Sequence, residues 1–230
     1  MIFVAINMPG YDNQLKADTM LHYLVREPKI KSLKPPVIFL LHGVASNEKD
    51  LFSFADQLPG KYLVVSVRAP YILGPESYAW YHVDFATGKP VANGQGEEKS
   101  RNEILAFMGQ FERVHPYDEN EVYLVGFSQG AIMSFAVGLT RPDKVRGIAV
   151  MSGRILDDVK PLVASPDKLK HLQVFMTHGT NDKVLDIGYA RASKAYLNTV
   201  GIKPTYKEYP EGHTISREMV VDLIGWLSRD

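Results

Sequence analysis

The feature that most constrains the fold of this chain is the sequence GFSQG at residues 126–130, which lies between two different apolar runs. The run before it, 122–125, is typical of a buried strand, and the run after it, 131–137, is typical of a helix. Glycines on both sides of Ser128 permit a turn too tight for a Cβ, and such a turn holds the serine in strained backbone. A serine there projects its hydroxyl toward a helix N-terminus, where developing negative charge is favoured. The pattern indicates that Ser128 is a nucleophile.

A serine hydroxyl needs a neighbouring base, and the base needs a group that orients it. The candidate base is His213, on a loop between a strand-like run at 205–209 and an amphipathic helix predicted over 216–227. The candidate acid is Asp182, which follows the strand predicted at 173–177. The order serine, aspartate, histidine along the chain is that of α/β-hydrolases and differs from the orders in chymotrypsin and subtilisin.

Four short motifs together resemble those of the phospholipase/carboxylesterase family of α/β-hydrolases, which includes small bacterial carboxylesterases and acyl-protein thioesterases. The motifs are LLHG at 40–43, GFSQG at 126–130, HGTND at 178–182 and GH at 212–213. The resemblance extends from about residue 37 to the C-terminus. It implies that Ser128 is the nucleophile, that His213 is the general base and acid, and that Asp182 is the orienting carboxylate. Asp186 is the rival acid, and the family's position directly after the strand favours Asp182.

The resemblance also implies an oxyanion hole made by two backbone N–H groups. One belongs to Gln129, next to the nucleophile, and the other to Val44, which follows the pair His42 and Gly43. Family members usually carry a glycine-rich stretch after that pair, whereas this chain has VASN at 44–47. The departure keeps the backbone donor and is expected to change the shape of the acyl pocket. We expect His42 to order this loop by hydrogen bonding rather than to react.

Strand-like and helical patterns alternate along the chain and predict an α/β fold with a mostly parallel central sheet and helices on both faces. We expect one α/β-hydrolase domain over residues 1–230 with no large cap domain. The alternating run 21–26 predicts an antiparallel edge strand. Parallel strands are predicted at 37–41, 62–67, 122–125, 145–151, 173–177 and 205–209, and helices at about 97–114, 189–200 and 216–227.

Two longer segments are predicted to be loops. The segment 68–96 shows no clear element and follows a strand end, where α/β sheets bind ligands. Its aromatic residues, among them Trp80 and Tyr81, are predicted to line the substrate pocket or to anchor the loop itself. The segment 152–171 is too short for a cap domain, which predicts a shallow, open active site. Arg154 in this segment is either a contact for an anionic part of a substrate or an ion-pair partner at the surface.

Composition limits the other classes of function. The 26 basic and 26 acidic side chains give a formal net charge of zero, so no basic surface for nucleic acid is indicated. The chain has no cysteine, which excludes disulfides, thiolate metal sites and the cysteine nucleophile of the related dienelactone hydrolases. Residues 1–7 lack the features of a signal peptide, and no run approaches the roughly 18 apolar residues of a membrane span. These features predict a cytoplasmic protein without integral membrane association.

Together these patterns predict a serine hydrolase that cleaves small carboxylic esters or thioesters through an acyl-enzyme on Ser128 and needs neither a metal ion nor an organic cofactor. A thioesterase or lysophospholipase acting on acylated proteins or lipids would use the same residues, as would a serine peptidase, which usually carries extra domains. A non-catalytic binding protein on this fold is the alternative from another class, although such proteins typically lose a triad member. The sequence fixes neither the acyl chain length nor the oligomeric state, and it is compatible with a homodimer.

Overall fold

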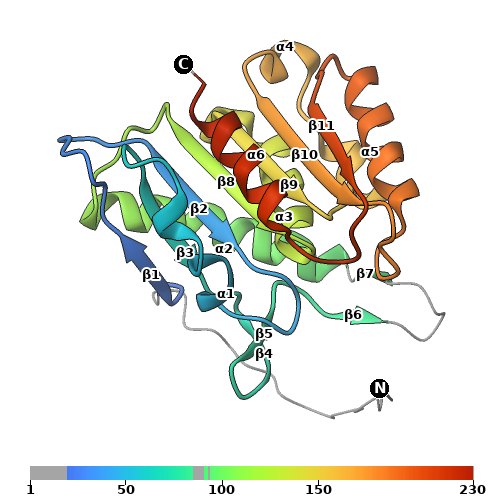
Figure 1. Cartoon of the computed structure of the whole chain (residues 1–230), viewed down its shortest axis with the longest axis horizontal. Helices are drawn as coiled ribbons and strands as arrows, with labels where there is room; N and C mark the ends of the chain where they lie inside the picture. Colours follow the sequence, from blue (N-terminus) through green and yellow to red (C-terminus); the bar gives the residue numbers. More distant parts are fainter. Residues whose placement is uncertain (1–19, 85–90, 93, 230) are drawn as a thin grey trace.

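The computed structural model describes residues 20–84, 91–92 and 94–229, and its centre is a seven-stranded sheet (Figure 1). The prediction about the start of the chain, residues 1–7, lies outside the described residues. The strand order is β1-β3-β2-β8-β9-β10-β11, and neighbouring strands are parallel except for β1, which is antiparallel to β3 at the edge. The strands are β1 (Tyr23–Arg26), β2 (Val37–Leu41), β3 (Leu63–Val67), β8 (Val122–Phe127), β9 (Gly147–Met151), β10 (Gln173–Gly179) and β11 (Thr205–Tyr209).

The central strands read as unbroken apolar runs because both faces of the sheet are covered. Every residue of β2, β3 and β9 is buried. Successive side chains of a strand point to opposite faces, so each strand contributes to two separate clusters. In β2, Phe39 and Leu41 belong to one hydrophobic cluster, and Ile38 and Leu40 belong to the other.

The helices divide between these two faces. On the face of Phe39 lie α2 (Gly94–Val114), α3 (Gln129–Thr140) and α5 (Ile187–Thr199), which contribute Phe107, Met133 and Leu197 to the shared cluster. The opposite face is covered by α1 (Lys49–Phe52) and α6 (Arg217–Leu227). Figure 1 shows α6 in front of the sheet and α2 behind it. None of the helices in the described part of the chain has the length and apolar character needed to cross a membrane.

The prediction that residues 68–96 contain no clear element is wrong. β4 (Tyr71–Gly74) and β5 (Ser77–Ala79) form one hairpin, β6 (Val83–Asp84) pairs with β7 (Val91–Ala92), and α2 already begins at Gly94. The first hairpin turns at Pro75 and Glu76, and Glu76 has a φ of 53°. These strands are too short to show a periodic pattern in the sequence, and residues 85–90 lie outside the described part.

The segment 152–171 contains only two short helices, η3 (Asp157–Leu162) and α4 (Pro166–Leu169). No cap domain is therefore inserted between β9 and β10. Two further short helices, η1 (Ala55–Gln57) and η2 (Pro142–Lys144), lie in other connections.

The sheet topology brings distant residues to one edge. β8, β9, β10 and β11 are parallel neighbours, so their carboxyl ends lie side by side. The turn after β8 contains Ser128, the loop after β10 contains Asp182, and the loop after β11 contains His213. Ligands of open α/β sheets bind at this edge.

Candidate active site

The turn between β8 and α3 holds Ser128 in an unusual conformation. Its φ is 52° and its ψ is −113°, which confirms the predicted backbone strain. The Ser128 N–H donates to the carbonyl of Met151 at 2.9 Å, and the Ser128 carbonyl accepts from the N–H of Ile132 at 3.1 Å. A Cβ on Gly126 would overlap the backbone of Gly130, and a Cβ on Gly130 would overlap the carbonyl of Leu41. Both glycines are therefore required for this tight turn.

The imidazole of His213 lies between the other two candidate residues. Its Nε2 is 2.9 Å from Ser128 Oγ, and its Nδ1 is 2.7 Å from Asp182 Oδ2. Because an ionised carboxylate only accepts hydrogen bonds, we assign the imidazole proton to Nδ1. Nε2 is then the acceptor for the Ser128 hydroxyl. Ser128 is 7% exposed and the His213 side chain is 16% exposed.

The carboxylate of Asp182 is fully buried and accepts hydrogen bonds from three N–H groups. Oδ1 accepts from the backbone N–H groups of Val184 and Leu185, both at 2.8 Å. Oδ2 accepts from His213, and it also lies 3.3 Å from Nε2 of His178, which makes its own hydrogen bond with the carbonyl of Leu185 at 2.7 Å. A buried carboxylate is stable only with such partners, and these donors also fix its orientation.

The rival acid, Asp186, has a different contact. Its side chain is exposed and accepts a hydrogen bond from the N–H of Gly188 at 2.8 Å, so it caps the N-terminus of α5. The structure therefore brings Asp182, rather than Asp186, to the imidazole.

Backbone hydrogen bonds join the loop that carries Asp182 to the loop that carries His213. The N–H of Thr180 donates to the carbonyl of Tyr209 at 2.7 Å, and the N–H of Asn181 donates to that of Glu211 at 2.9 Å. The backbones pass so closely that a Cβ on Gly179 would overlap the Glu211 carbonyl. Because Gly179 lacks a Cβ, the two loops can approach this closely.

The two predicted oxyanion donors lie on either side of the nucleophile. Gln129 follows Ser128 directly, and a Cβ on Gly43, which precedes Val44, would lie 3.4 Å from Ser128 Cβ. Within the part of the chain that the structure describes, the N–H groups of Val44 and Gln129 donate to no protein acceptor. Two such N–H groups can receive the negative charge of a carbonyl oxygen in acyl transfer.

The residues predicted to line the substrate pocket make contacts with other residues of the protein. Trp80 and Tyr81 are 0% and 1% exposed, and their backbones hydrogen-bond to the side chain of Gln129. The Arg154 guanidinium carbon lies 4.7 Å from the centre of the Tyr189 ring. Their contact with substrate stays a prediction.

The side chain of Gln129 is the feature that the sequence reasoning missed, since only its backbone N–H was considered. Gln129 is 3% exposed, and the other buried side chains of α3 are nearly all apolar. A polar residue at the first position of such an apolar helix is the sequence signal that could have indicated a buried hydrogen-bonding role.

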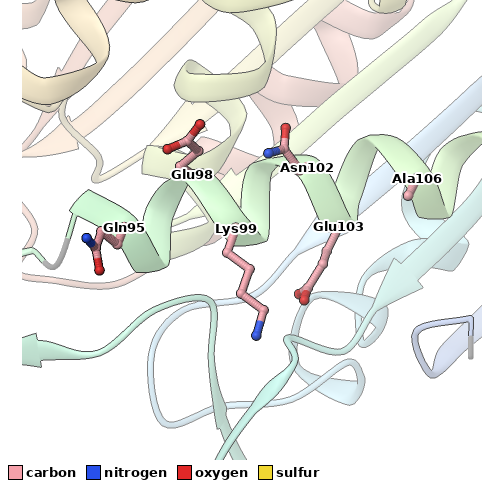
Figure 2. Close-up of a pocket in the computed structure, with 6 residues that line it drawn as sticks. All are labelled: Gln95, Glu98, Lys99, Asn102, Glu103 and Ala106. Carbon is pink, nitrogen blue, oxygen red and sulfur yellow. The ribbon is translucent and has the colours of Figure 1, made fainter. Parts of the chain in front are cut away.

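A hollow of about 480 Å³ lies along one helix and contains no candidate site residue (Figure 2). All of its lining residues belong to α2, and Lys99 and Glu103 point to the same side of that helix. They are Gln95, Glu98, Lys99, Asn102, Glu103 and Ala106. Among residues 20–84, 91–92 and 94–229, no group of three or more His, Cys, Asp or Glu is arranged to hold a metal ion.

Comparison with known proteins places this chain in a family. The family model described as phospholipase/carboxylesterase matches residues 23–229, which is most of the chain. The chain belongs to the phospholipase/carboxylesterase family. This confirms the family predicted from the four motifs, and the protein is a carboxylesterase-family hydrolase.

Individual relatives of this family member are distant. It is 26% identical to the carboxylesterase SOBER1 of Arabidopsis thaliana over 155 residues, which cover 66% of this chain and 67% of that protein. It is also 26% identical to acyl-protein thioesterase 1 of Yarrowia lipolytica over 163 residues, covering 66% and 68%. The crystal structure of the Bacillus cereus carboxylesterase matches with a TM-score of 0.79 and 21% identity, covering 91% of this chain and 94% of that one. This likeness confirms the predicted fold.

Proposed function

We propose that this chain hydrolyses carboxylic esters through an acyl-enzyme on Ser128, with His213 and Asp182 as the other members of a catalytic triad. The observation that carries the proposal is the position of His213, 2.9 Å from Ser128 Oγ and 2.7 Å from Asp182 Oδ2. Membership of the phospholipase/carboxylesterase family supports the same reaction class. The strained turn at Ser128 adds to it, because such strain is typical of functional sites.

In the first half of the reaction, Ser128 Oγ attacks the carbonyl carbon of the ester while its proton moves to His213 Nε2. The carboxylate of Asp182 stabilises the imidazolium that forms. The negative charge on the carbonyl oxygen is stabilised by the N–H groups of Val44 and Gln129, and one such donor contributes a factor of about 10²–10³ in rate. The tetrahedral intermediate then breaks its bond to the alcohol oxygen, which leaves with the proton from His213.

In the second half, a water molecule attacks the acyl-enzyme and gives its proton to His213 Nε2. The second tetrahedral intermediate expels Ser128 Oγ, which regains the proton from His213, and the carboxylic acid is released. The same residues act twice, so the mechanism requires no metal ion or organic cofactor.

A thioester substrate is the second candidate, because several relatives of this chain are named acyl-protein thioesterase 1. The same attack on a thioester carbonyl expels a thiol instead of an alcohol, and a lysophospholipid ester would be attacked in the same way. We place the acyl group near Trp80 and Tyr81 and any anionic part of the substrate near Arg154. A single domain over 1–230, a cytoplasmic location and a homodimer stay predictions from the sequence.

The test is hydrolysis of p-nitrophenyl esters from acetate to palmitate, alongside N-acetylcysteamine thioesters of the same acyl groups. We expect wild-type turnover, and we expect Ser128→Ala to lower kcat by about 10⁴–10⁶ because the triad acts as a unit. The acyl-length optimum reports the depth of the pocket, and the ratio of ester to thioester rates separates the two candidates.

Ser152→Ala is the matched control for this test. Ser152 also follows a strand end and has a φ of 52°, but its buried hydroxyl has no hydrogen-bond partner among the described residues. The kcat of Ser152→Ala should stay within a few-fold of the wild-type value. A near-normal rate in Ser128→Ala would contradict the assignment of the nucleophile.

A further inference from the structure

We infer that His42, Trp80 and Gln129 form a hydrogen-bonded brace that fixes the two oxyanion donors relative to each other. The inference rests on the proposed function, because it assigns these side chains to positioning the N–H groups of Val44 and Gln129. They act through backbone and contact no reacting atom, so they are positioning residues. The two donors come from segments far apart in the chain, and only their surroundings can set their separation.

The first part of the brace is the side-chain amide of Gln129. Its Oε1 accepts from the backbone N–H of Trp80 at 2.8 Å, and its Nε2 donates to the carbonyl of Tyr81 at 2.7 Å. Gln129 and Trp80 are 3% and 0% exposed, so water does not compete for these bonds. The residue next to the nucleophile is thereby tied, through its side chain, to the segment at 80–81.

The second part is Trp80, which reaches the other donor loop. Its indole Nε1 donates to the carbonyl of His42 at 2.9 Å. The carbonyl of Trp80 accepts from the hydroxyl of Ser100 on α2. The N–H, the carbonyl and the indole N–H of Trp80 are therefore all bonded, which leaves this side chain and its backbone one position.

The third part is the imidazole of His42, which holds the peptide that contains the Val44 donor. Nε2 of His42 accepts from the N–H of Ala69 at 3.0 Å, so its proton lies on Nδ1, 2.7 Å from the carbonyl of Gly43. The carbonyl of Gly43 and the N–H of Val44 belong to one planar peptide group. Fixing that carbonyl therefore fixes the direction of the N–H on the opposite side. A hydrogen bond to the carbonyl also polarises the peptide and strengthens its N–H as a donor.

The strand before Trp80 adds a further link to the same loop. The N–H of Ala45 donates to the carbonyl of Tyr78 at 2.8 Å, and the N–H of Tyr78 donates to the carbonyl of Ser46 at 2.9 Å. The segment 78–81 thus bonds to the turn after β2 through Tyr78 and Trp80, and to the turn after β8 through Gln129. The packing of both turns against this short segment sets the distance between the two N–H groups.

Loosening the brace should weaken binding of the transition state more than binding of the substrate. The negative charge meets the donors only after attack, so a misplaced donor lowers kcat and leaves KM nearly unchanged. Loss of one oxyanion donor lowers the rate by about 10²–10³, and a displaced donor should cost less, about 10–100-fold.

The test uses Trp80→Phe and Gln129→Met, two variants that keep the approximate shape and remove hydrogen bonds. Trp226→Phe is the matched control, since Trp226 is also buried but packs on Phe175 in the cluster on the other face of the sheet. For each variant we would measure kcat, KM and the inhibition constant of an alkyl trifluoromethyl ketone, which forms a hemiketal oxyanion with the serine. Melting temperatures show that each variant is folded.

For Trp80→Phe and Gln129→Met we expect kcat to fall about 10–100-fold and the ketone inhibition constant to rise by the factor lost in kcat/KM. KM should change less than about 3-fold in Gln129→Met, whose side chain is not placed at the acyl group. Trp226→Phe should lower the melting temperature without changing kcat. Folded brace variants with wild-type kcat and ketone affinity would overturn the brace alone. A folded wild type that hydrolyses no ester and binds no ketone would overturn the proposed function, and the brace with it. If one brace variant does not fold, the other decides the outcome.

Discussion

Replacement of Asp182 by asparagine changes the proton on His213 without changing the shape of the site. The Asp182 Oδ1 atom accepts from the N–H groups of Val184 and Leu185, both at 2.8 Å. An asparagine keeps these two bonds only if its carbonyl oxygen occupies that place. Its NH₂ group then faces Nδ1 of His213, where the carboxylate had accepted at 2.7 Å. The opposite flip would place the NH₂ group against two backbone donors, so the first orientation is favoured.

Facing an NH₂ donor, the imidazole of His213 must present Nδ1 as an acceptor and carry its proton on Nε2. That nitrogen lies 2.9 Å from Ser128 Oγ and can no longer accept the hydroxyl proton. The Asp182 side chain is 0% exposed, so water does not relieve the mismatch. A triad with the wrong imidazole tautomer loses about 10⁴ in kcat. At 1.36 kcal/mol for each tenfold change, this loss is about 5 kcal/mol of transition-state stabilisation.

The assay is steady-state hydrolysis of a p-nitrophenyl ester at pH 7.5 by wild type, Asp182→Asn and Asp186→Asn, with circular dichroism to confirm folding. Asp186 is the matched control because it caps α5, and asparagine caps a helix about as well as aspartate. We expect kcat to fall about 10⁴-fold in Asp182→Asn and to stay unchanged in Asp186→Asn. A folded Asp182→Asn variant with kcat within tenfold of wild type would refute the tautomer argument.

Three further predictions concern stability. Burial lowers the pKa of His42 below its ordinary value and outweighs the opposing effect of nearby groups. Just below pH 6.5, the unfolded chain therefore binds more protons than the folded chain. The free energy of unfolding should therefore decrease as the pH is lowered through that range, by up to about 1.4 kcal/mol per pH unit. Urea titrations at several pH values should show a weaker dependence of this free energy on pH for His42→Asn. Gly130→Ala places a Cβ against the carbonyl of Leu41 and should lower the free energy of unfolding by about 3 kcal/mol; a urea titration showing a loss below about 1 kcal/mol would contradict this. Glu48→Gln weakens the pair between the buried Glu48 and the partly exposed Arg68, whose guanidinium bonds both carboxylate oxygens at 2.6 and 2.7 Å. It should cost about 2 kcal/mol in the same assay at pH 7, and an unchanged midpoint would contradict the role of the pair.

The central sheet, and the meeting of Ser128, His213 and Asp182 at its edge, could be predicted from the sequence because both leave strong local signals. Strands covered on two faces are continuous apolar runs, such as 37–41, and the run 21–26 predicts the edge strand that the structure has at 23–26. The GFSQG turn can be recognised by its two glycines. The structure requires them because a Cβ on Gly126 or Gly130 would overlap backbone atoms. The parallel order of strands then brings Asp182 and His213 to the same edge.

The hairpins and the brace leave no such local signal. β4 and β5 are short, and their pairing depends on a turn at Pro75 and Glu76 rather than on an apolar period. The brace depends on which backbone groups the Gln129 amide meets after folding, and its partners at residues 80–81 are distant in the sequence. The position of residues 68–96 after a strand end predicts Trp80 either at a pocket wall or as an anchor of its own loop, and its complete burial shows that it belongs to the core.

The central claim is that Ser128, activated by His213, is the reacting group. The most direct measurement is intact-protein mass spectrometry after incubation with a fluorophosphonate, followed by peptide mapping of the adduct. We predict one adduct per chain on Ser128 of the wild type, a much slower reaction in His213→Ala, and no adduct in Ser128→Ala. A folded wild type that forms no adduct, or that carries the adduct on another serine such as Ser152, would contradict the account.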